Sequence, residues 1–288
     1  MANTVFLDYD QAGLDAQYNL RERHKDFPQY HARNQATSAQ ARTAFGGRLD
    51  LAYGDSPGQR LDLFLPAAPR PPLVAFIHGG YWQRLDKSEY SYLAPAFLEA
   101  GIAFASINYD LAPTVSVGEI VRQARAAVAW LHGEAEAFGF DPARIVVAGH
   151  SAGGQLAAMV LSGEKSGTQV VGACAVSGVF DLGPMRLSYQ QPVLQLTAAA
   201  ARDLSPINAL PASASPLILA VGDQETEEFL RQQADYGAAW RGAGHRLQVI
   251  DLPGRHHFTA VDALGEAGHP LHAAVSGLAL NRGGGDAI

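Results

Sequence analysis

Short apolar runs alternate with longer helical patterns from residue 73 to residue 252. Each run is a continuous stretch of mainly β-branched or small apolar residues, which is typical of strands buried on both faces. The predicted strands are 73–77, 102–107, 144–148, 170–176, 217–221 and 247–252. Apolar residues at helical spacing predict helices over roughly 88–100, 116–138, 152–163 and 226–242. This order predicts an α/β fold with a mostly parallel twisted sheet and helices on both faces.

The region before this alternation has two different patterns. Residues 1–45 are mostly polar and helix-compatible, which predicts a helical arm packed on the domain. Residues 48–53 and 61–65 alternate apolar and polar positions around a turn-rich segment, which predicts an antiparallel hairpin at an edge of the sheet.

Residues 178–216 form the one long stretch without a clear period. Long insertions in such folds are often lids or binding loops, so we expect this segment to cap the site. The glycine-rich tail 282–288 is expected to be frayed. The whole chain, residues 1–288, is predicted to be a single domain.

Composition narrows the class of protein. With 48% hydrophobic and 17% charged residues, the 288-residue chain can bury a sizeable core. The net charge of −7 comes without a basic block, so we expect a small-molecule substrate and no nucleic-acid partner. No apolar run is long enough to span a bilayer and no signal peptide pattern is present, so we expect a cytoplasmic protein. The chain is compatible with a homodimer as well as with a monomer.

The segment Gly149-His150-Ser151-Ala152-Gly153 follows a predicted strand and precedes a predicted helix. This context is typical of a nucleophile elbow, in which a tight turn lifts a serine hydroxyl clear of its neighbours. Such a turn tolerates almost no side-chain bulk, which accounts for the two glycines. We therefore predict Ser151 as a catalytic nucleophile. The single cysteine, Cys174, lies in a predicted buried strand and is expected to be a core residue.

Serine attack on an acyl carbon creates an oxyanion, which two convergent backbone N–H groups stabilise. One donor is expected from Ala152, and the glycine-rich loop at Gly79 and Gly80 is expected to supply the others. The next residues, Tyr81 and Trp82, are predicted to form a pocket wall. The preceding residue, His78, is expected to fix this loop through bonds from its ring to backbone.

The general base should lie after the last strand, where His256 and His257 are adjacent. We favour His257, because the apolar Phe258 directly after it could anchor the ring. For His150, inside the elbow, we expect a structural role. No histidines show metal-ligand spacing, and neither a metal nor an organic cofactor is expected.

Five motifs together resemble the α/β-hydrolase type of kynurenine formamidase, or arylformamidase, within the hormone-sensitive-lipase-like esterases. They are His-Gly-Gly-Tyr-Trp-Gln at 78–83, Asn-Tyr-Asp-Leu-Ala-Pro at 108–113, Gly-His-Ser-Ala-Gly at 149–153, Glu-Phe-Leu-Arg-Gln at 228–232 and His-Phe at 257–258. The likeness runs from about residue 48 to residue 265. It implies an α/β-hydrolase fold, Ser151 as nucleophile, His257 as base, an acid in the loop after Val221, and Gly79, Gly80 and Ala152 as oxyanion donors.

Two carboxylates compete for the role of the acid. The resemblance places Glu225 at the position of the acid, where aspartate is the commoner residue, and Asp223 stands two residues away. Asp223 has a ready local role in closing the turn after the strand, whereas Glu225 precedes the helix capped by Thr226 and is free to reach the histidine. We predict Glu225 as the acid and keep Asp223 as its rival.

The residues and the resemblance predict a serine hydrolase that cleaves a formyl group from N-formyl-L-kynurenine. Tyr81, Trp82 and Phe258 are predicted to form an aromatic slot for the leaving group. A carboxylesterase acting on short-chain or aryl esters is the alternative. A catalytically silent binding protein on the same fold is a third, less favoured hypothesis, because all three triad roles are filled.

Overall fold

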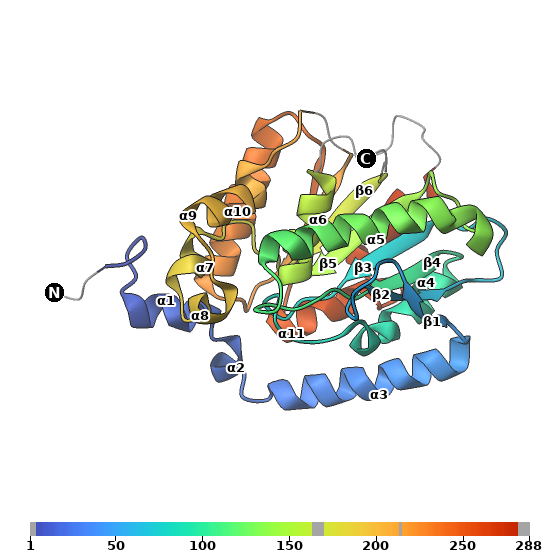
Figure 1. The fold of residues 1–288 in the computed structure, drawn as a ribbon, viewed down its shortest axis with the longest axis horizontal. Helices are drawn as coiled ribbons and strands as arrows, with labels where there is room; N and C mark the ends of the chain where they lie inside the picture. Colours follow the sequence, from blue (N-terminus) through green and yellow to red (C-terminus); the bar gives the residue numbers. More distant parts are fainter. Residues whose placement is uncertain (1–3, 163–169, 213–214, 282–288) are drawn as a thin grey trace.

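The computed structural model describes residues 4–162, 170–212 and 215–281, so the tail for which fraying was expected lies outside the described residues. Eight strands form one sheet in the order β1-β2-β4-β3-β5-β6-β7-β8 (Figure 1). The strands are β1 (Arg48–Ala52), β2 (Arg60–Phe64), β3 (Leu73–Ile77), β4 (Ala103–Ile107), β5 (Ile145–His150), β6 (Gly172–Val176), β7 (Leu217–Gly222) and β8 (Leu247–Leu252). β1 and β2 pair antiparallel, as does β2 with β4, and the pairs from β4 through β8 are parallel. The predicted hairpin edge and parallel sheet are confirmed.

Helices cover both faces of the sheet, as predicted. On one face lie α5 (Val117–Phe138), α6 (Ala152–Leu161) and α10 (Glu227–Gly242), and on the other α4 (Ala94–Glu99) and α12 (Pro270–Leu280). Successive residues of β3 explain why the strand is apolar throughout. Leu73, Ala75 and Ile77 pack into the first core, whereas Val74 and Phe76 pack into the second. Cys174 is fully buried in the second core, as expected.

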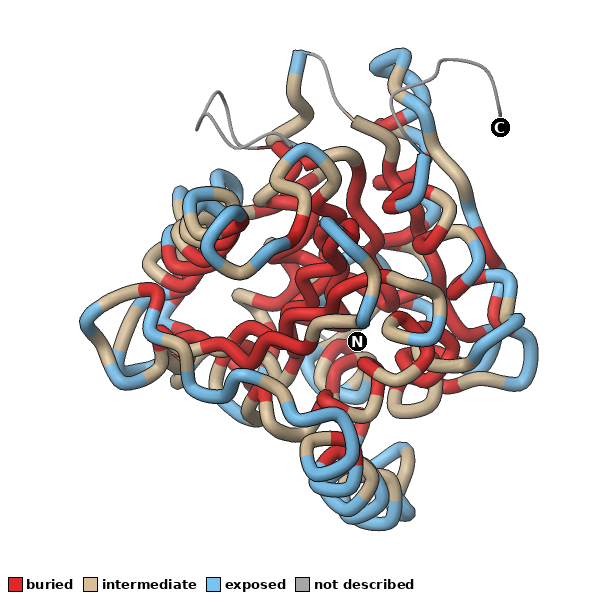
Figure 2. Tube along the Cα trace, turned by 90° about the vertical axis from the view of Figure 1, so that its right-hand side faces the viewer, coloured by how far each residue is buried: buried red, intermediate tan, exposed pale blue. Residues whose placement is uncertain are grey.

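The N-terminal arm consists of α1 (Gln11–Tyr18), α2 (Leu20–Arg23) and α3 (Phe27–Phe45). α1 packs against α7 (Gly183–Leu187) and α10, while α3 runs along one side of the molecule against η1 (Lys87–Glu89) and η2 (Ser91–Leu93) (Figure 1). α3 is amphipathic only weakly. Ser38 and Ala41 are its buried residues, and the helix at the bottom of Figure 2 is correspondingly exposed along most of its length.

The segment 178–216, the predicted cap, folds into short helices where the structure describes it. These are α7, α8 (Gln191–Leu194), α9 (Ala198–Asp203) and η3 (Pro206–Asn208). They lie at the same end of the molecule as α1 and α10 (Figure 1). After β8, the chain forms α11 (His257–Ala260) and η4 (Val261–Leu264) before α12.

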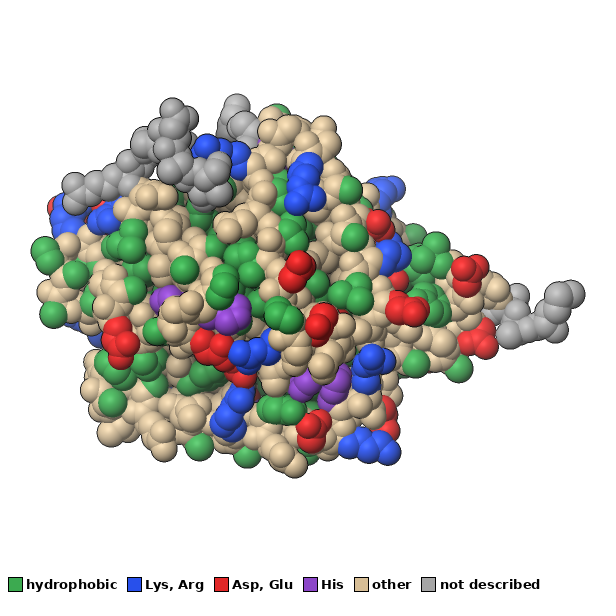
Figure 3. Space-filling model, turned by 180° about the vertical axis from the view of Figure 1, so that it is seen from behind, with side chains coloured by type: hydrophobic (Ala, Val, Ile, Leu, Met, Phe, Trp, Pro, Cys, Tyr) green, Lys and Arg blue, Asp and Glu red, His purple; other side chains and the backbone are tan. Residues whose placement is uncertain are grey.

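Basic and acidic side chains are interspersed on the face drawn in Figure 3. None of the helices in the described part of the chain combines the length and the apolar character that crossing a bilayer requires.

Sheet register positions the loops that carry the predicted site residues. Ile77 of β3 pairs with Gly149 of β5, so the loop after β3 meets the loop after β5. Gly222 of β7 pairs with Leu252 of β8, which brings the loops carrying the acid and the base together. Because carboxyl ends of parallel strands meet at one edge, the site forms there.

Candidate active site

Ser151 occupies a strained turn between β5 and α6. Its backbone has φ 58° and ψ −120°, a conformation that L-residues rarely adopt. A Cβ on Gly149 would lie 2.0 Å from the carbonyl oxygen of Gly153, and a Cβ on Gly153 would lie 2.0 Å from that of Ile77. Only glycine fits these two positions, so the geometry is that of a nucleophile elbow.

The glycine-rich loop after β3 lies directly against the elbow. A Cβ on Gly79 would lie 2.7 Å from the carbonyl oxygen of His150 and 3.0 Å from Cβ of Ser151. The hydroxyl of Tyr109 donates to the carbonyl oxygen of His78 at 2.9 Å and lies 3.2 Å from that of Gly79. Because a peptide is planar, fixing the Gly79 carbonyl also fixes the direction of the Gly80 N–H group.

His78 lies in this loop in the position expected of a loop-fixing residue. Its Nδ1 donates to the carbonyl oxygen of Gly79 at 2.8 Å, and its Nε2 lies 2.9 Å from the side-chain amide of Asn108. At the elbow itself, Ala152 is the first residue of α6, a position whose N–H group has no acceptor within the helix. The loop and the helix start thus both bring backbone close to Ser151.

His257 is held by a buried carboxylate. Its Nδ1 lies 3.1 Å and 3.0 Å from the two carboxylate oxygens of Glu225. The side chain of Glu225 is 0% exposed and that of His257 4% exposed. His257 also lines the same pocket as Ser151. A buried carboxylate on Nδ1 leaves Nε2 as the free ring nitrogen, which is the arrangement a general base requires.

Asp223, the rival acid, lies elsewhere. It is exposed, and its Oδ1 accepts a hydrogen bond from the N–H group of Gly254 at 2.8 Å. It therefore ties the loop after β7 to the loop after β8, rather than closing its own turn two residues on as predicted.

The start of α10 is capped by a residue of the arm. Thr226 is the N-cap residue, but its hydroxyl donates to the carbonyl oxygen of Gln17 at 3.0 Å instead of capping the helix. The Gln17 side chain in turn accepts from the N–H group of Glu228 at 3.1 Å. α1 thus anchors the segment that carries Glu225, a long-range contact with no sequence signature.

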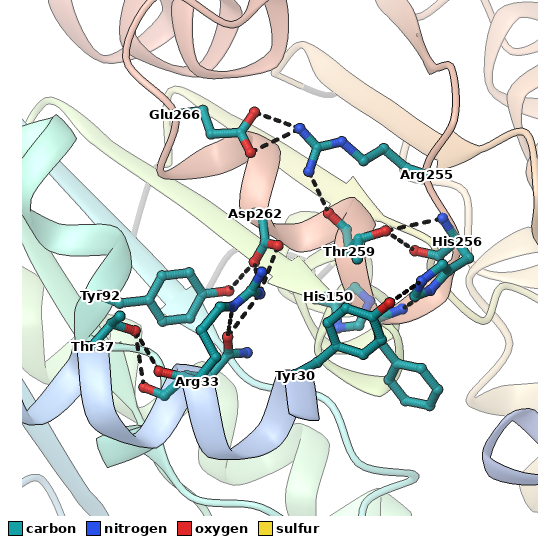
Figure 4. Close-up of polar contacts among 12 residues, drawn as sticks. Tyr30, Arg33, Thr37, Tyr92, His150, Arg255, His256, Thr259, Asp262 and Glu266 are labelled. Atoms are coloured by element: carbon teal, nitrogen blue, oxygen red, sulfur yellow. Dashed lines mark hydrogen bonds and ion pairs between the residues drawn. The ribbon is translucent and has the colours of Figure 1, made fainter. Parts of the chain in front are cut away.

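His150 and His256 support the base from two sides. His150 Nε2 donates to the carbonyl oxygen of His257 at 2.9 Å, and burial holds the pKa of His150 well below its usual value, so the ring stays neutral. His256 caps α11, because its Nδ1 accepts from the N–H group of Phe258. Its Nε2 donates to the hydroxyl of Tyr30 at 3.2 Å (Figure 4). Both histidines are structural neighbours of His257.

Six phenylalanine and tyrosine side chains form an aromatic wall in the pocket around Ser151. Tyr81 and Phe258 line it as predicted, together with Tyr90 and Tyr189. Residues 178–216, the predicted cap, contribute Tyr189 and Gln190 among their described residues.

Trp82 does not belong to this wall, which corrects the prediction. Its side chain is 0% exposed, and its indole N–H donates to Oε1 of Gln155 in α6 at 3.1 Å. Tyr81 and Trp82 have φ of 53° and 58°, so two successive left-handed residues turn the chain and send Trp82 into the core.

The N-terminal arm supplies the wall that sequence reasoning missed. Six residues of α2 and α3 line the pocket: Leu20, Arg21, Phe27, Tyr30, His31 and Asn34. α3 is fixed by polar contacts, as Figure 4 shows for Arg33 and Tyr92, which converge on Asp262 at 2.7 to 2.9 Å. The helical pattern of the arm was recognisable, but no motif within it pointed to the site.

Within the described residues, no group of three or more His, Cys, Asp or Glu side chains is arranged to hold a metal ion. The residues gathered here are a serine on a strained turn, a histidine with a buried carboxylate, and adjacent backbone N–H groups. This set can carry out acyl transfer through a covalent intermediate.

Several known proteins are similar to this chain in sequence and in fold. A family model described as BD-FAE matches residues 61–181. The kynurenine formamidase of Salmo salar is 31% identical over 77% of this chain and 79% of its own length, and that of Danio rerio is 32% identical over 78% and 79%. This chain belongs to the kynurenine formamidase family.

A solved structure also resembles this protein over most of its length. A crystal structure from Silicibacter sp. TM1040, described as that of a candidate thioesterase, matches with a TM-score of 0.82 at 31% identity. The match covers 91% of this chain and 98% of that one. This protein is therefore an α/β-hydrolase, an enzyme acting on formamides or esters.

Proposed function

We propose that this enzyme hydrolyses N-formyl-L-kynurenine to L-kynurenine and formate, with Ser151, His257 and Glu225 as its catalytic triad. The observation that carries the proposal is the aromatic wall around Ser151, formed by Tyr81, Phe258 and other rings. The substrate is an aryl formamide, whose leaving group is an aromatic amine. Kinship with kynurenine formamidases over most of the chain supports the same substrate.

The first half of the reaction forms a formyl-enzyme. The Ser151 hydroxyl attacks the formyl carbon and passes its proton to Nε2 of His257. Glu225, on Nδ1, stabilises the imidazolium that results. The N–H groups of Gly79, Gly80 and Ala152 are proposed to bind the oxyanion. When the C–N bond breaks, His257 returns the proton to the departing aromatic amine, which leaves as kynurenine.

The second half releases formate. His257 takes a proton from water, and the hydroxide formed in this way attacks the formyl carbon of the acyl-enzyme. Collapse of the second tetrahedral intermediate breaks the bond to Ser151, whose oxygen recovers a proton from His257. Every proton removed is thus returned, and no cofactor takes part.

A carboxylesterase acting on short-chain or aryl esters is the second candidate. The related structure described as a candidate thioesterase favours it, because that description indicates acyl transfer from a leaving group other than an amine. The same triad performs this chemistry, since an ester presents the same kind of acyl carbon.

The direct test is product analysis with purified enzyme and N-formyl-L-kynurenine. We expect kynurenine and formate in a one-to-one ratio, and an acid-quenched reaction should contain enzyme carrying a formyl group on the peptide that includes Ser151. Turnover without any acyl-enzyme under rapid quench, or no kynurenine at all, would refute the proposal.

A further inference from the structure

Three charged side chains line the pocket but have no part in acyl transfer. Arg21 comes from α2, Arg84 from the loop after β3 and Glu89 from η1. Arg21 and Arg84 are exposed, whereas Ser151 in the same pocket is 3% exposed. The two guanidinium groups therefore lie at the outer end of the pocket, and the nucleophile lies at its base.

Neither arginine has a carboxylate at ion-pair distance among the described residues, although Glu89 is close enough to Arg21 to attract it electrostatically. Within the described residues, no ion pair or side-chain hydrogen bond joins Arg21 or Arg84 to another group, whereas Arg33 on α3 is paired with Asp262. The Arg21 guanidinium lies over the ring of Phe27, 4.4 Å from its centre. Partial desolvation, and after it the like charge of Arg84, lowers the pKa of Arg21. Two cations near one another at a pocket rim form a site that an anion would stabilise.

Glu89 supplies the opposite charge. Its side chain is 13% exposed, and its Oε2 lies 2.8 Å from Nδ1 of His31, which also lines the pocket. Burial raises the pKa of Glu89. Among the described lining residues, Glu89 is the only carboxylate. The pocket lining thus contains two arginines and one carboxylate.

We propose that Arg21, Arg84 and Glu89 form a recognition site for the α-amino-acid end of the substrate. Arg21 and Arg84 bind the carboxylate, and Glu89 binds the ammonium group. This inference rests on the proposed function, since the kynurenine part carries such an end and leaves from the outer side of the pocket.

The chemistry of the groups favours this assignment. Guanidinium groups bind carboxylates through parallel hydrogen bonds and lose little hydration in doing so. The aromatic rings that line the pocket suit the aryl ring that joins the formamide to the amino-acid end. The arrangement orients the substrate with its formyl carbon at Ser151 and its charges at the rim.

The test compares two formamides in each variant. 2-Formamidoacetophenone lacks the amino-acid end of N-formyl-L-kynurenine and has the same reacting group. We expect Arg21→Gln and Arg84→Gln each to lower the ratio of kcat/KM for N-formyl-L-kynurenine over 2-formamidoacetophenone by roughly 10-fold to 100-fold, through KM. Arg84→Lys should lose less, because it keeps the charge. Ratios within twofold of wild type in both glutamine variants would overturn the carboxylate site.

Glu89→Gln tests the ammonium site with a different pair. The deamino analogue, 4-(2-formamidophenyl)-4-oxobutanoate, keeps the carboxylate and lacks the ammonium group. We expect Glu89→Gln to lower the ratio of N-formyl-L-kynurenine over this analogue by about 10-fold. An unchanged ratio would remove Glu89 from recognition. Arg23→Gln, an exposed arginine of α2 outside the lining, is the matched control and should keep both wild-type ratios.

The carboxylate site can be tested separately from the proposed function, with aryl acetates as substrates. If the wild-type enzyme cleaves aryl acetates and neither formamide, the proposed function fails. The carboxylate site is then measured with 3-acetoxybenzoate against phenyl acetate. A drop of about 10-fold in this ratio in Arg84→Gln supports the site, and an unchanged ratio overturns it.

Discussion

At the scale of single residues, the proposed chemistry depends first on Ser151. Its strained backbone and the glycines at 149 and 153 serve to present one hydroxyl. We expect Ser151→Ala to lower kcat by about 10⁴-fold or more while the protein keeps its fold, because alanine fits the turn. Steady-state kinetics and circular dichroism measure the two effects. A variant with a tenth of wild-type activity would exclude Ser151 as the nucleophile.

The choice between the two carboxylates gives a second test. Glu225 is buried on Nδ1 of His257, whereas Asp223 is exposed and bonded to Gly254. We expect Glu225→Gln to lower kcat/KM by about 10²-fold or more, and Asp223→Asn to change it severalfold at most. The opposite order of the two losses would assign the acid to Asp223.

Trp82 provides a test of the corrected pocket. Trp82→Phe removes the donor to Gln155 and leaves that buried oxygen unpaired, which should lower the free energy of unfolding by about 1–3 kcal/mol. The preference among substrates should stay that of the wild type. Denaturant unfolding and kcat/KM ratios check both points, with Phe258→Ala as the comparison that should alter the ratios. A changed kcat/KM ratio in Trp82→Phe would show that Trp82 contributes to substrate binding.

At the scale of elements, the strands were predictable and the arm's role was not. Strands such as β3 are apolar at every position because both faces are buried, so the sequence carries the signal directly. Trp82 was misplaced because left-handed backbone at two aromatic residues is rare and leaves no pattern. Arg21 and Tyr30 reach the site only through tertiary packing of α2 and α3, and periodicity cannot show this.

Asp262 attaches α3 to the body of the domain. Asp262, which is buried, accepts hydrogen bonds from Arg33 and from Tyr92 on the body of the domain. We expect Asp262→Asn to loosen α3, to raise KM for N-formyl-L-kynurenine roughly fivefold, and to increase hydrogen exchange over residues 27–45. Arg122→Ala, which breaks an exposed pair with Glu119 on α5, is the control and should do neither. Unchanged exchange over α3 in Asp262→Asn would show that other contacts hold it.

At the scale of the whole molecule, the sheet and the arm contribute different parts of the site. Register across β3, β5, β7 and β8 places the loops that carry Ser151, Glu225 and His257, and it follows from strands that the sequence identifies. The arm contributes six residues to the pocket lining, among them Arg21, whose charge acyl transfer does not need. The positions of Ser151, His257 and Glu225 were therefore predictable from local motifs, whereas the pocket residues of α2 and α3 reach the site through contacts between distant segments.

We propose that this pocket selects an aryl formamide over simple esters. The most direct measurement is kcat/KM of the wild-type enzyme for N-formyl-L-kynurenine, p-nitrophenyl acetate and p-nitrophenyl butyrate under identical conditions. We predict that the formamide exceeds both esters by about tenfold or more, and that acetate exceeds butyrate, because a formyl-specific site favours the smallest acyl group. A butyrate ester cleaved faster than N-formyl-L-kynurenine would contradict the account and identify a carboxylesterase.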